Sequence, residues 1–297
     1  MNGLADHLII APIVLPLVVA ALIMMVEQRP LRVALSLATS VALVLISTTL
    51  LISVAGTDAG ARAYELGDWP APFGIVLVLD KLSAMMVVLA SVLALAAFVF
   101  SLARWDRAGP RFHALFLLLL TGLNGAFLTG DLFNLFVFFE VLLAASYGLV
   151  LHGSGTPRVK AGLHYIAINL GASSLFLIGV AVIYGITGTL NMADLAARIP
   201  NIAGPQRALF EMGCAILGVA FLIKAGAWPL GFWLAPAYSA SSAPAAALFA
   251  IMTKVGIYAT LRATFLYFGP DAGGVELFRS PLLLVGGAFT IGMSAIG

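Results

Sequence analysis

Long apolar runs separated by short polar connections dominate this sequence. The runs cover Leu8–Val26, Val33–Val54, Leu82–Ala103, His113–Thr129, Asp131–His152, Val159–Ile186, Ala208–Ser239 and Pro244–Tyr267, and a ninth begins near Pro281. A helix rises about 1.5 Å per residue, so about 20 apolar residues cross a hydrocarbon core roughly 30 Å thick. The pattern predicts an all-α polytopic membrane protein with about nine transmembrane helices.

The run from Ala208 to Ser239 is too long for one comfortable span and too short for two. Gly226 and Pro229 lie near its middle, and a proline removes a backbone hydrogen bond and clashes with the preceding turn. We therefore expect a discontinuous helix that breaks at Gly226 and Pro229, a device that transporters place at the membrane midplane beside binding sites.

Two segments do not fit a transmembrane helix. The polar connection that begins at Ala55 leads into the β-rich stretch Phe73–Leu79, which is too short to span, so residues 60–80 are expected to form a hairpin on the membrane surface. Leu190–Ile199 has its apolar positions on one face, as in an interfacial helix. We expect one transmembrane domain over 1–297: 1–112 with three helices and the hairpin, 113–267 with helices four to eight, and 268–297 with the start of the ninth.

Composition excludes a soluble enzyme, because 62% of the residues are hydrophobic and 9% are charged. The net charge of +2 comes without a basic cluster, so no nucleic-acid partner is expected. The motifs of metal sites, phosphate-binding loops and nucleophile triads are absent from the sequence, which predicts no cofactor and no metal. The one cysteine, Cys214, lies in an apolar run and is interpreted as a small buried side chain.

The cations in the short connections predict the orientation. They fall between the first and second, third and fourth, and fifth and sixth spans: Arg29, Arg32, Arg104, Arg107, Arg111, Arg158 and Lys160. Cytoplasmic loops retain an excess of Lys and Arg, so these connections are expected in the cytoplasm and the N-terminus outside.

Three charges are expected deep in the membrane: Glu140 at the midpoint of the fifth span, Lys224 beside the predicted break, and Lys254 in the eighth span. An ionisable group at the bilayer centre costs at least about 2.5 to 3.5 kcal/mol on insertion scales, and it usually marks an ion or proton path. The alternative is an ion pair that only fastens helices, but one acid can neutralise only one of two lysines.

A proton switch is one hypothesis for these charges. A carboxylate beside an ammonium keeps both groups charged, while separation leaves the lysine desolvated and ready to release its proton. Movement of Glu140 away from Lys224 would then send a proton toward Lys254. The gap needs water or hydroxyls, and the candidates are Ser146, Tyr147, Ser173, Ser174 and Thr253, although membrane Ser and Thr side chains mostly bond to their own helix.

The remaining polar residues are weaker candidates. His164 near the start of the sixth span could take up protons from the cytoplasm, because imidazole exchanges protons near neutral pH, or it is an ordinary interfacial histidine. His7, His113 and His152 stand at span ends, where solvated caps are expected. Asp131 is expected to cap the fifth helix, and Asp80 receives no role.

Several long motifs resemble the proton-translocating membrane subunits shared by respiratory complex I and the multisubunit Mrp-type cation/proton antiporters. They are YELGDWPAPFGIVLVLDKLSA, the Glu140 helix, HYIAINLGASSLFLIGVAVIYGITGTLNMADLA, FLIKAGAWPLGFWLAPAY and MTKVGIYATLR, and the likeness covers about residues 60–267. Within the family the chain looks most like the D-type component of an Mrp or Pha antiporter, because VLLAASYGLVLHG follows Glu140 where complex I relatives tend to have Pro-Met.

The resemblance implies that Glu140 pairs with Lys224 and that Lys254 passes protons toward the membrane centre, in helices four to eight. It also implies a bacterial inner-membrane protein with a periplasmic hairpin, partner membrane subunits, and Na⁺ or K⁺ exchanged for protons. Gly231 replaces a histidine of many complex I relatives, which argues against a histidine relay there. The family fold has about fourteen helices, so the chain is expected to be C-terminally incomplete.

Three functions follow from these expectations. The leading one is a proton-conducting subunit of a Na⁺/H⁺ or K⁺/H⁺ antiporter, which is a transporter subunit and not an enzyme. The alternative is the corresponding pump subunit of a complex I-like oxidoreductase or a membrane-bound hydrogenase. A third is a structural subunit that only holds partners together, against which the buried charges speak.

Overall fold

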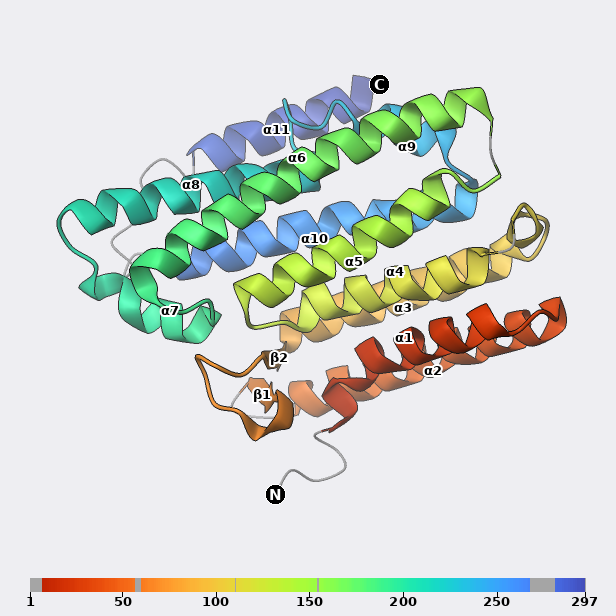
Figure 1. Cartoon of the computed structure of the whole chain (residues 1–297), viewed down its shortest axis with the longest axis horizontal. Helices are drawn as coiled ribbons and strands as arrows, with labels where there is room; N and C mark the ends of the chain where they lie inside the picture. Colours follow the sequence, from red (N-terminus) through yellow and green to blue (C-terminus); the bar gives the residue numbers. More distant parts are fainter. Residues whose placement is uncertain (1–6, 57–59, 110, 154, 268–280, 297) are drawn as a thin grey trace.

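The computed structural model describes residues 7–56, 60–109, 111–153, 155–267 and 281–296, which form a helical bundle with one β-hairpin (Figure 1). The elements are α1 (Ala11–Met25), α2 (Arg29–Ala55), β1 (Ala61–Glu65), β2 (Val76–Asp80), α3 (Lys81–Ser101), α4 (Phe112–Leu128), α5 (Leu132–Val150), α6 (Thr156–Thr187), α7 (Met192–Arg198), α8 (Pro205–Ala225), α9 (Leu234–Ala240), α10 (Ala243–Tyr267) and α11 (Pro281–Ile296).

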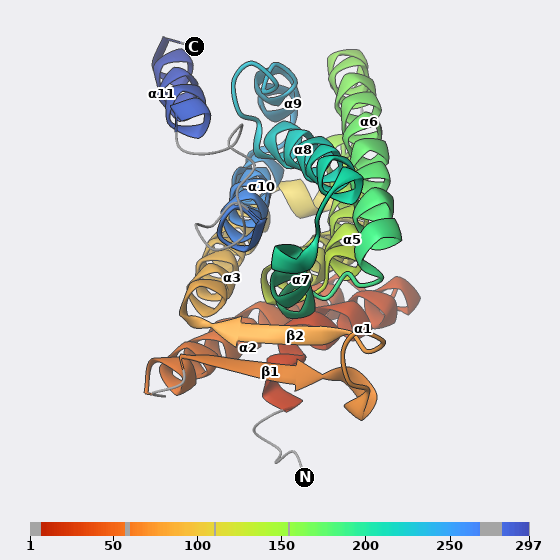
Figure 2. The ribbon, with the colours of Figure 1, turned by 90° about the vertical axis from the view of Figure 1, so that its left-hand side faces the viewer.

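Six helices among the described residues are long and apolar enough to cross a membrane: α2, α3, α5, α6, α8 and α10. Two shorter apolar helices, α1 and α4, accompany them, and α11 lies at the edge of the bundle (Figure 2). The prediction of an all-α polytopic fold is confirmed.

Helix α4 forms the centre of the bundle and packs against α1, α3 and α5. All of its side chains are buried except those of Leu115 and Leu118, which are partly exposed. Asn124, halfway along α4, donates a hydrogen bond from Nδ2 to the carbonyl oxygen of Pro12 at 2.9 Å. This bond satisfies a buried amide that would otherwise be costly in an apolar interior.

The predicted hairpin is present as the antiparallel pair β1 and β2, with Tyr64 opposite Leu77. It is not a loose surface feature, because Leu77 and Leu79 are fully buried and Gly130 donates a hydrogen bond to the Val76 carbonyl at 2.8 Å. The hairpin and α7 lie at the same end of the bundle (Figures 1 and 2). The short helix predicted around Leu190–Ile199 is α7.

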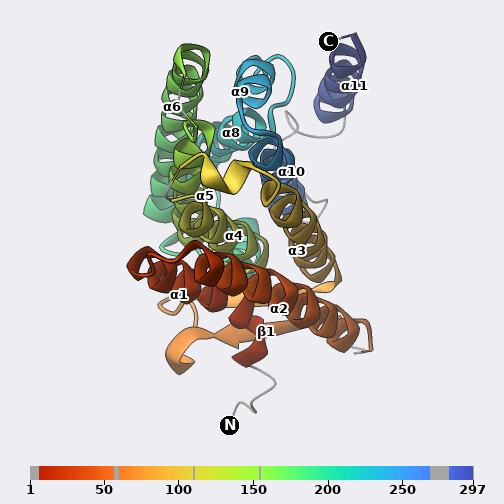
Figure 3. The ribbon, with the colours of Figure 1, turned by 90° about the vertical axis from the view of Figure 1, so that its right-hand side faces the viewer.

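The three basic connections meet at the opposite end (Figures 1 and 3). Arg29 at the start of α2 pairs with the buried Asp106 of the α3–α4 connection at 2.8 Å. The prediction that His113 and His152 are solvated caps is wrong, because this connection packs over both. His113 bonds to Ser36 at 3.1 Å, and His152 bonds to the Trp105 carbonyl at 3.0 Å.

Helix starts follow local chemistry. Asp131 caps α5, as predicted, by accepting a hydrogen bond from the Asn134 amide at 2.8 Å. Asp80 caps α3 in a capping box with Ser83, and Asn191 caps α7. These side chains satisfy backbone amides that have no partner in the first helical turn.

Helix α8 breaks where the sequence indicates. It ends at Ala225, and Gly226 follows at φ 67°, a left-handed conformation that favours glycine. The chain is non-helical until α9 begins at Leu234. The Trp233 indole N–H donates to the Ile223 carbonyl at 3.1 Å and thereby satisfies one carbonyl of the last turn of α8.

Candidate proton-transfer site

Lys224 is the next-to-last residue of α8 and is 4% exposed. Its Nζ atom lies 5.0 Å from the ring centroid of Phe139 on α5. An aromatic face attracts a cation electrostatically, and more strongly when water is excluded. The broken helix therefore ends with an ammonium group held inside the protein against an aromatic ring.

Glu140 is partly buried near the middle of α5, and a serine connects it to Lys224. The Ser173 hydroxyl of α6 donates a hydrogen bond to Oε1 of Glu140, and Lys224 Nζ donates to the same hydroxyl at 3.1 Å. Among the described residues no ion pair within 4.0 Å joins Glu140 directly to Lys224. The predicted charges are brought together, with a hydroxyl between them.

The site depends on a close crossing of α6 and α8. A β-carbon on Gly179 would lie 2.9 Å from the backbone nitrogen of Leu217, and one on Gly213 would lie 2.9 Å from the Val182 side chain. Small residues let helix backbones approach closely in membrane proteins. This approach brings the short Ser173 side chain within reach of Lys224.

A stripe of polar residues follows the buried face of α6. Tyr165, Asn169 and Ser173 are spaced four residues apart, and all three are buried. Asn169 was not a sequence candidate, although residues four apart share a helix face. The four-residue spacing of Tyr165, Asn169 and Ser173 was the sequence feature that could have identified Asn169 as part of the site.

A small enclosed cavity adjoins Lys224. Its volume is about 10 Å³, close to the minimum that one water molecule needs. The lining comes from α5, α6, α8, the break, α9 and α10: Phe139, Leu142, Leu143, Tyr165, Asn169, Lys224, Trp233, Tyr238 and Met252. Polar and apolar side chains therefore share the space beside the ammonium.

Lys254 does not have the predicted surroundings. We expected a desolvated lysine, but Lys254 is exposed on the described chain, on the α10 face that also exposes Ile257 and Leu261. The reason is the rotation of α10 about its axis. Thr253 lies on the face that packs into the bundle, whereas Lys254, like Ile257 three residues later, lies on the outer face. Its Nζ atom donates to Thr253 Oγ1 at 3.3 Å. On the inner side, the Thr253 hydroxyl adjoins that of Tyr238.

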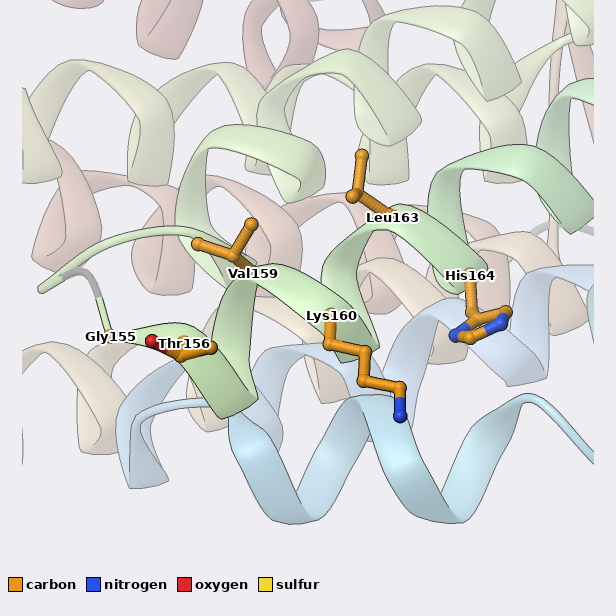
Figure 4. Close-up of a pocket in the computed structure, with 6 residues that line it drawn as sticks. All are labelled: Gly155, Thr156, Val159, Lys160, Leu163 and His164. Atoms are coloured by element: carbon orange, nitrogen blue, oxygen red, sulfur yellow. The ribbon is translucent and has the colours of Figure 1, made fainter.

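His164 lies on an exposed part of α6, one turn after Lys160. Both line an open pocket of about 630 Å³ near the helix start (Figure 4). In the described part of the chain no hydrogen bond links His164 to Glu140, Ser173 or Lys224. The structure thus places this histidine at the basic end, on the opposite side of α6 from the polar stripe.

The other candidate hydroxyls divide into two groups. Ser146, Ser174 and Thr253 each donate to a carbonyl three or four residues earlier in their own helix, the usual arrangement. The Ser146 hydroxyl also bonds to that of Tyr165 on α6 at 2.7 Å. The Tyr147 hydroxyl is buried and has no hydrogen-bond partner within the residues described. Ser173 is the exception that reaches two other helices.

A second polar group, which the sequence did not indicate, lies near the hairpin. Arg262 of α10 pairs with Asp80 at 2.6 Å and donates to the Tyr258 hydroxyl at 2.7 Å. Tyr258 in turn donates to the Phe127 carbonyl at 2.7 Å. Burial raises the pKa of Asp80, but the bonds from Arg262 and Ser83 outweigh it, so the net pKa is lowered.

Burial also acts on a titratable group at the basic end. It lowers the pKa of His152, and the nearby Arg158 charge adds to the effect. The Trp105 carbonyl and Asp106 oppose this shift without cancelling it. Neutral imidazole is therefore favoured at that end.

The described residues contain no group of three His, Cys, Asp or Glu side chains that could hold a metal ion. The charges of this site instead consist of one carboxylate and one ammonium with a hydroxyl between them. Such a set can exchange protons.

Comparison with known proteins places the chain in a family. The family model described as NADH:quinone oxidoreductase/Mrp antiporter matches residues 129–295, a region that includes Glu140, Ser173, Lys224 and Lys254. The chain belongs to this family.

The relatives are components of cation/proton antiporters. The chain is 57% identical, over all of its length and 56% of the relative's, to a protein of Rhizobium meliloti named as the probable D component of a K⁺/H⁺ antiporter. It is 42% identical, over 98% of its length and 58% of the relative's, to the D component of a Na⁺/H⁺ antiporter of Alkalihalophilus pseudofirmus. The chain thus spans little more than half the length of these curated relatives.

A solved structure supports the same assignment. A chain of the Mrp complex from a Dietzia species superposes with a TM-score of 0.82 at 34% identity, over 89% of this chain and 49% of that one. The resemblance to the D-type component of Mrp antiporters is confirmed, and so is the relation to complex I through the family model. The chain is a transporter-family membrane protein, and its relatives work in multisubunit complexes.

Proposed function

We propose that this chain is a proton-conducting membrane subunit of a multisubunit Na⁺/H⁺ or K⁺/H⁺ antiporter. The observation that carries the proposal is the hydrogen-bonded connection between Glu140 and Lys224 inside the bundle. A partly buried carboxylate and a buried ammonium beside a broken helix are costly as structure alone. Their cost is explained if they exchange protons.

Lys224 is the group that changes its proton in this proposal. With Glu140 linked to it, the ammonium form is favoured by the opposite charge. When α5 and α8 move apart, the ammonium loses that partner in a dry environment and releases its proton. The break at Gly226 gives the end of α8 freedom to move without displacing the whole helix.

The released proton has a route toward Lys254. The cavity beside Lys224 is lined also by Tyr238, whose hydroxyl adjoins that of Thr253, and Lys254 donates to Thr253. One water in the cavity would complete the connection between the two lysines. Lys254 then serves as the relay that carries the proton to the outer face of α10.

The proposed orientation of the chain in the membrane rests on the distribution of its basic residues. The basic connections gather at one end of the bundle, and by the positive-inside rule that end faces the cytoplasm, with the N-terminus and the hairpin outside. His164, exposed near the basic end, would take up protons there. The bacterial relatives support a location in the bacterial inner membrane, among partner membrane subunits in lipid.

The names of the relatives include both K⁺ and Na⁺, so the proposal keeps both cations. The family model also includes subunits of NADH:quinone oxidoreductase, and the alternative remains a pump subunit of such a complex or of a membrane-bound hydrogenase. Genes for redox subunits beside the coding sequence would favour this alternative, and genes for small antiporter subunits would favour the antiporter.

The test uses the complete complex in everted membrane vesicles. Adding Na⁺ or K⁺ should collapse a preformed pH gradient, followed with a fluorescent pH probe. Glu140→Gln should reduce the initial rate by roughly 100-fold, the lower range for loss of one positioned proton-transfer group. Copurification of the partner subunits reports assembly.

Glu211→Gln is the matched control, because Glu211 is a partly buried glutamate of α8 that pairs with Arg207 one turn away and does not contact Lys224. This variant should exchange cations at the wild-type rate. Wild-type exchange by an assembled Glu140→Gln complex would contradict the proposal.

A further inference from the structure

Among the serines of the described transmembrane helices, Ser173 is the one that bridges a carboxylate and an ammonium on two other helices. The adjacent Ser174 donates to the Leu170 carbonyl of its own helix, as serines in helices usually do. The hydroxyl of Ser173 instead donates to Glu140 on α5 and accepts from Lys224 on α8. Within the described residues, one oxygen atom is the single hydrogen-bonded link between the two charges.

The Ser173 and Lys224 side chains of this link are buried, and Glu140 is partly buried. Ser173 is 6% exposed and Lys224 is 4% exposed, and Phe139 covers the ammonium from α5. A lysine amine and a carboxylate without direct contact need an intermediate group that both accepts and donates. A serine hydroxyl has one donor and two acceptor sites, so it can do both at once.

The directions of the two bonds have the order that a proton relay requires. The ammonium donates to the serine oxygen, and the serine O–H points to the carboxylate. A hydroxyl that only positioned Lys224 would not need to donate to Glu140. A hydroxyl that only stabilised the carboxylate would not need to accept from the ammonium.

We propose that the Ser173 hydroxyl conducts protons between Lys224 and Glu140. The Ser173 O–H bond breaks as its proton joins a carboxylate oxygen of Glu140, and one N–H bond of the Lys224 ammonium breaks as that proton forms a new O–H bond on Ser173. An ammonium and a carboxylate become an amine and a carboxylic acid. Serine carries one proton before and after.

The same group also determines when the two residues communicate. After the transfer the new O–H bond points to the Lys224 nitrogen, and rotation about the Cβ–Oγ bond returns it toward Glu140 once Lys224 is protonated again. Displacement of α8 by the length of one hydrogen bond interrupts the connection. Ser173 therefore opens and closes proton exchange within the pair.

This inference rests on the proposed function and adds an earlier step to it: the pair exchanges a proton while it is linked through Ser173, and the release toward Lys254 follows when Lys224 is protonated and the helices separate. It is tested in the same vesicles by measuring the antiport rate against pH and against cation concentration for Ser173→Ala, Ser173→Thr and Ser174→Ala. Ser173→Ala should lower the maximal rate by roughly 100-fold at every pH, the lower end of the range for a positioned proton-transfer group. The half-saturating cation concentration should not change, because no cation contact is lost.

The two other variants separate conduction from packing. Ser173→Thr keeps the hydroxyl and should restore most of the rate, and Ser174→Ala should behave as wild type. If Ser173→Ala does not assemble, Ser173→Cys is measured instead. Its side chain has nearly the volume of serine but is a weak donor and acceptor, so the same loss of rate is expected.

Two outcomes would overturn the inference. In the first, Ser173→Ala keeps the maximal rate and only displaces the profile along the pH axis, as the loss of a hydrogen bond to a carboxylate would do. In the second, Ser173→Thr is as slow as Ser173→Ala in an assembled complex. Glu140→Gln distinguishes the two levels: if it transports normally the proposed function fails, and if it is inactive while Ser173→Ala is normal only this inference fails.

Discussion

Gly256 of α10 lies directly against the backbone of Ala225, the last residue of α8. A β-carbon on Gly256 would be 2.4 Å from the Ala225 nitrogen and 2.9 Å from the Lys224 carbonyl carbon. The position of Lys224 is therefore set by a backbone contact with the helix that carries Lys254. The end of α8 that carries Lys224 and the part of α10 that carries Lys254 are therefore in direct backbone contact beside the break.

Gly256→Ala should force these helices apart, because backbone atoms cannot move aside as a flexible side chain can. We expect a loss of about 1 to 3 kcal/mol in stability, the usual cost of overpacking, and a slower antiport rate. Thermal unfolding in detergent and vesicle exchange would measure both. Gly171→Ala on α6, where a β-carbon meets nothing within 4 Å, is the control: it should leave the antiport rate unchanged and raise stability by about 0.4 to 1 kcal/mol.

Lys254 should act as a proton relay and not as a residue that stabilises helix packing. Because it is exposed on the described chain and bonds to Thr253 alone, Lys254→Ala should change stability by less than about 1 kcal/mol and remove proton-coupled exchange. Lys254→Arg should also be inactive, because a guanidinium keeps its proton in proteins. Lys224→Ala should damage both properties, since the Glu140–Ser173 group loses its counter-charge. Normal transport by Lys254→Arg would make Lys254 a fixed charge only.

The Asp80–Arg262 pair should give a pH-dependent part of the stability. The folded pKa of Asp80 is lowered, so its contribution is present above the unfolded value of about 3.9 and is lost as the pH falls through the folded value. Asp80→Ala should cost about 1 kcal/mol at neutral pH through the lost helix cap. Unfolding temperatures from pH 7 to acid should converge with wild type, while Glu65→Gln on β1 should follow wild type throughout.

The apolar runs of the sequence were sufficient to predict most of the helices of the fold. The apolar runs predicted the spans, because the bilayer demands a fixed length of apolar helix. Gly226 and Pro229 indicated the break, since both disfavour a continuing helix. The hairpin followed from a β-rich stretch too short to cross, but its burial did not, because the contact between Val76 and Gly130 joins distant parts of the chain.

The candidate site was predicted only in part. Glu140 and Lys224 stand out as charges in apolar runs, and their connection is present in the structure. Ser173 was one of five candidate hydroxyls, and no local feature separated it from Ser174, because its role depends on the crossing of α6 and α8. The exposed position of Lys254 depends on the rotation of α10, which a helix with apolar residues on all sides does not specify.

The burial of α4 has a further consequence for how the protein responds to its lipid environment. A helix of 17 residues is about 26 Å long, shorter than a typical hydrocarbon core. Because protein surrounds α4, hydrophobic mismatch acts on it little, whereas the longer α2 and α6 expose apolar residues and adapt to the bilayer by tilting, kinking or thickening it locally. Helix α5 has 19 residues, about the length that crosses the hydrocarbon core, whereas α6 has 32, so a change in bilayer thickness changes the fit of α6 more than that of α5. Membrane thinning or thickening would thus act on the bundle as a relative displacement of α6 past α5.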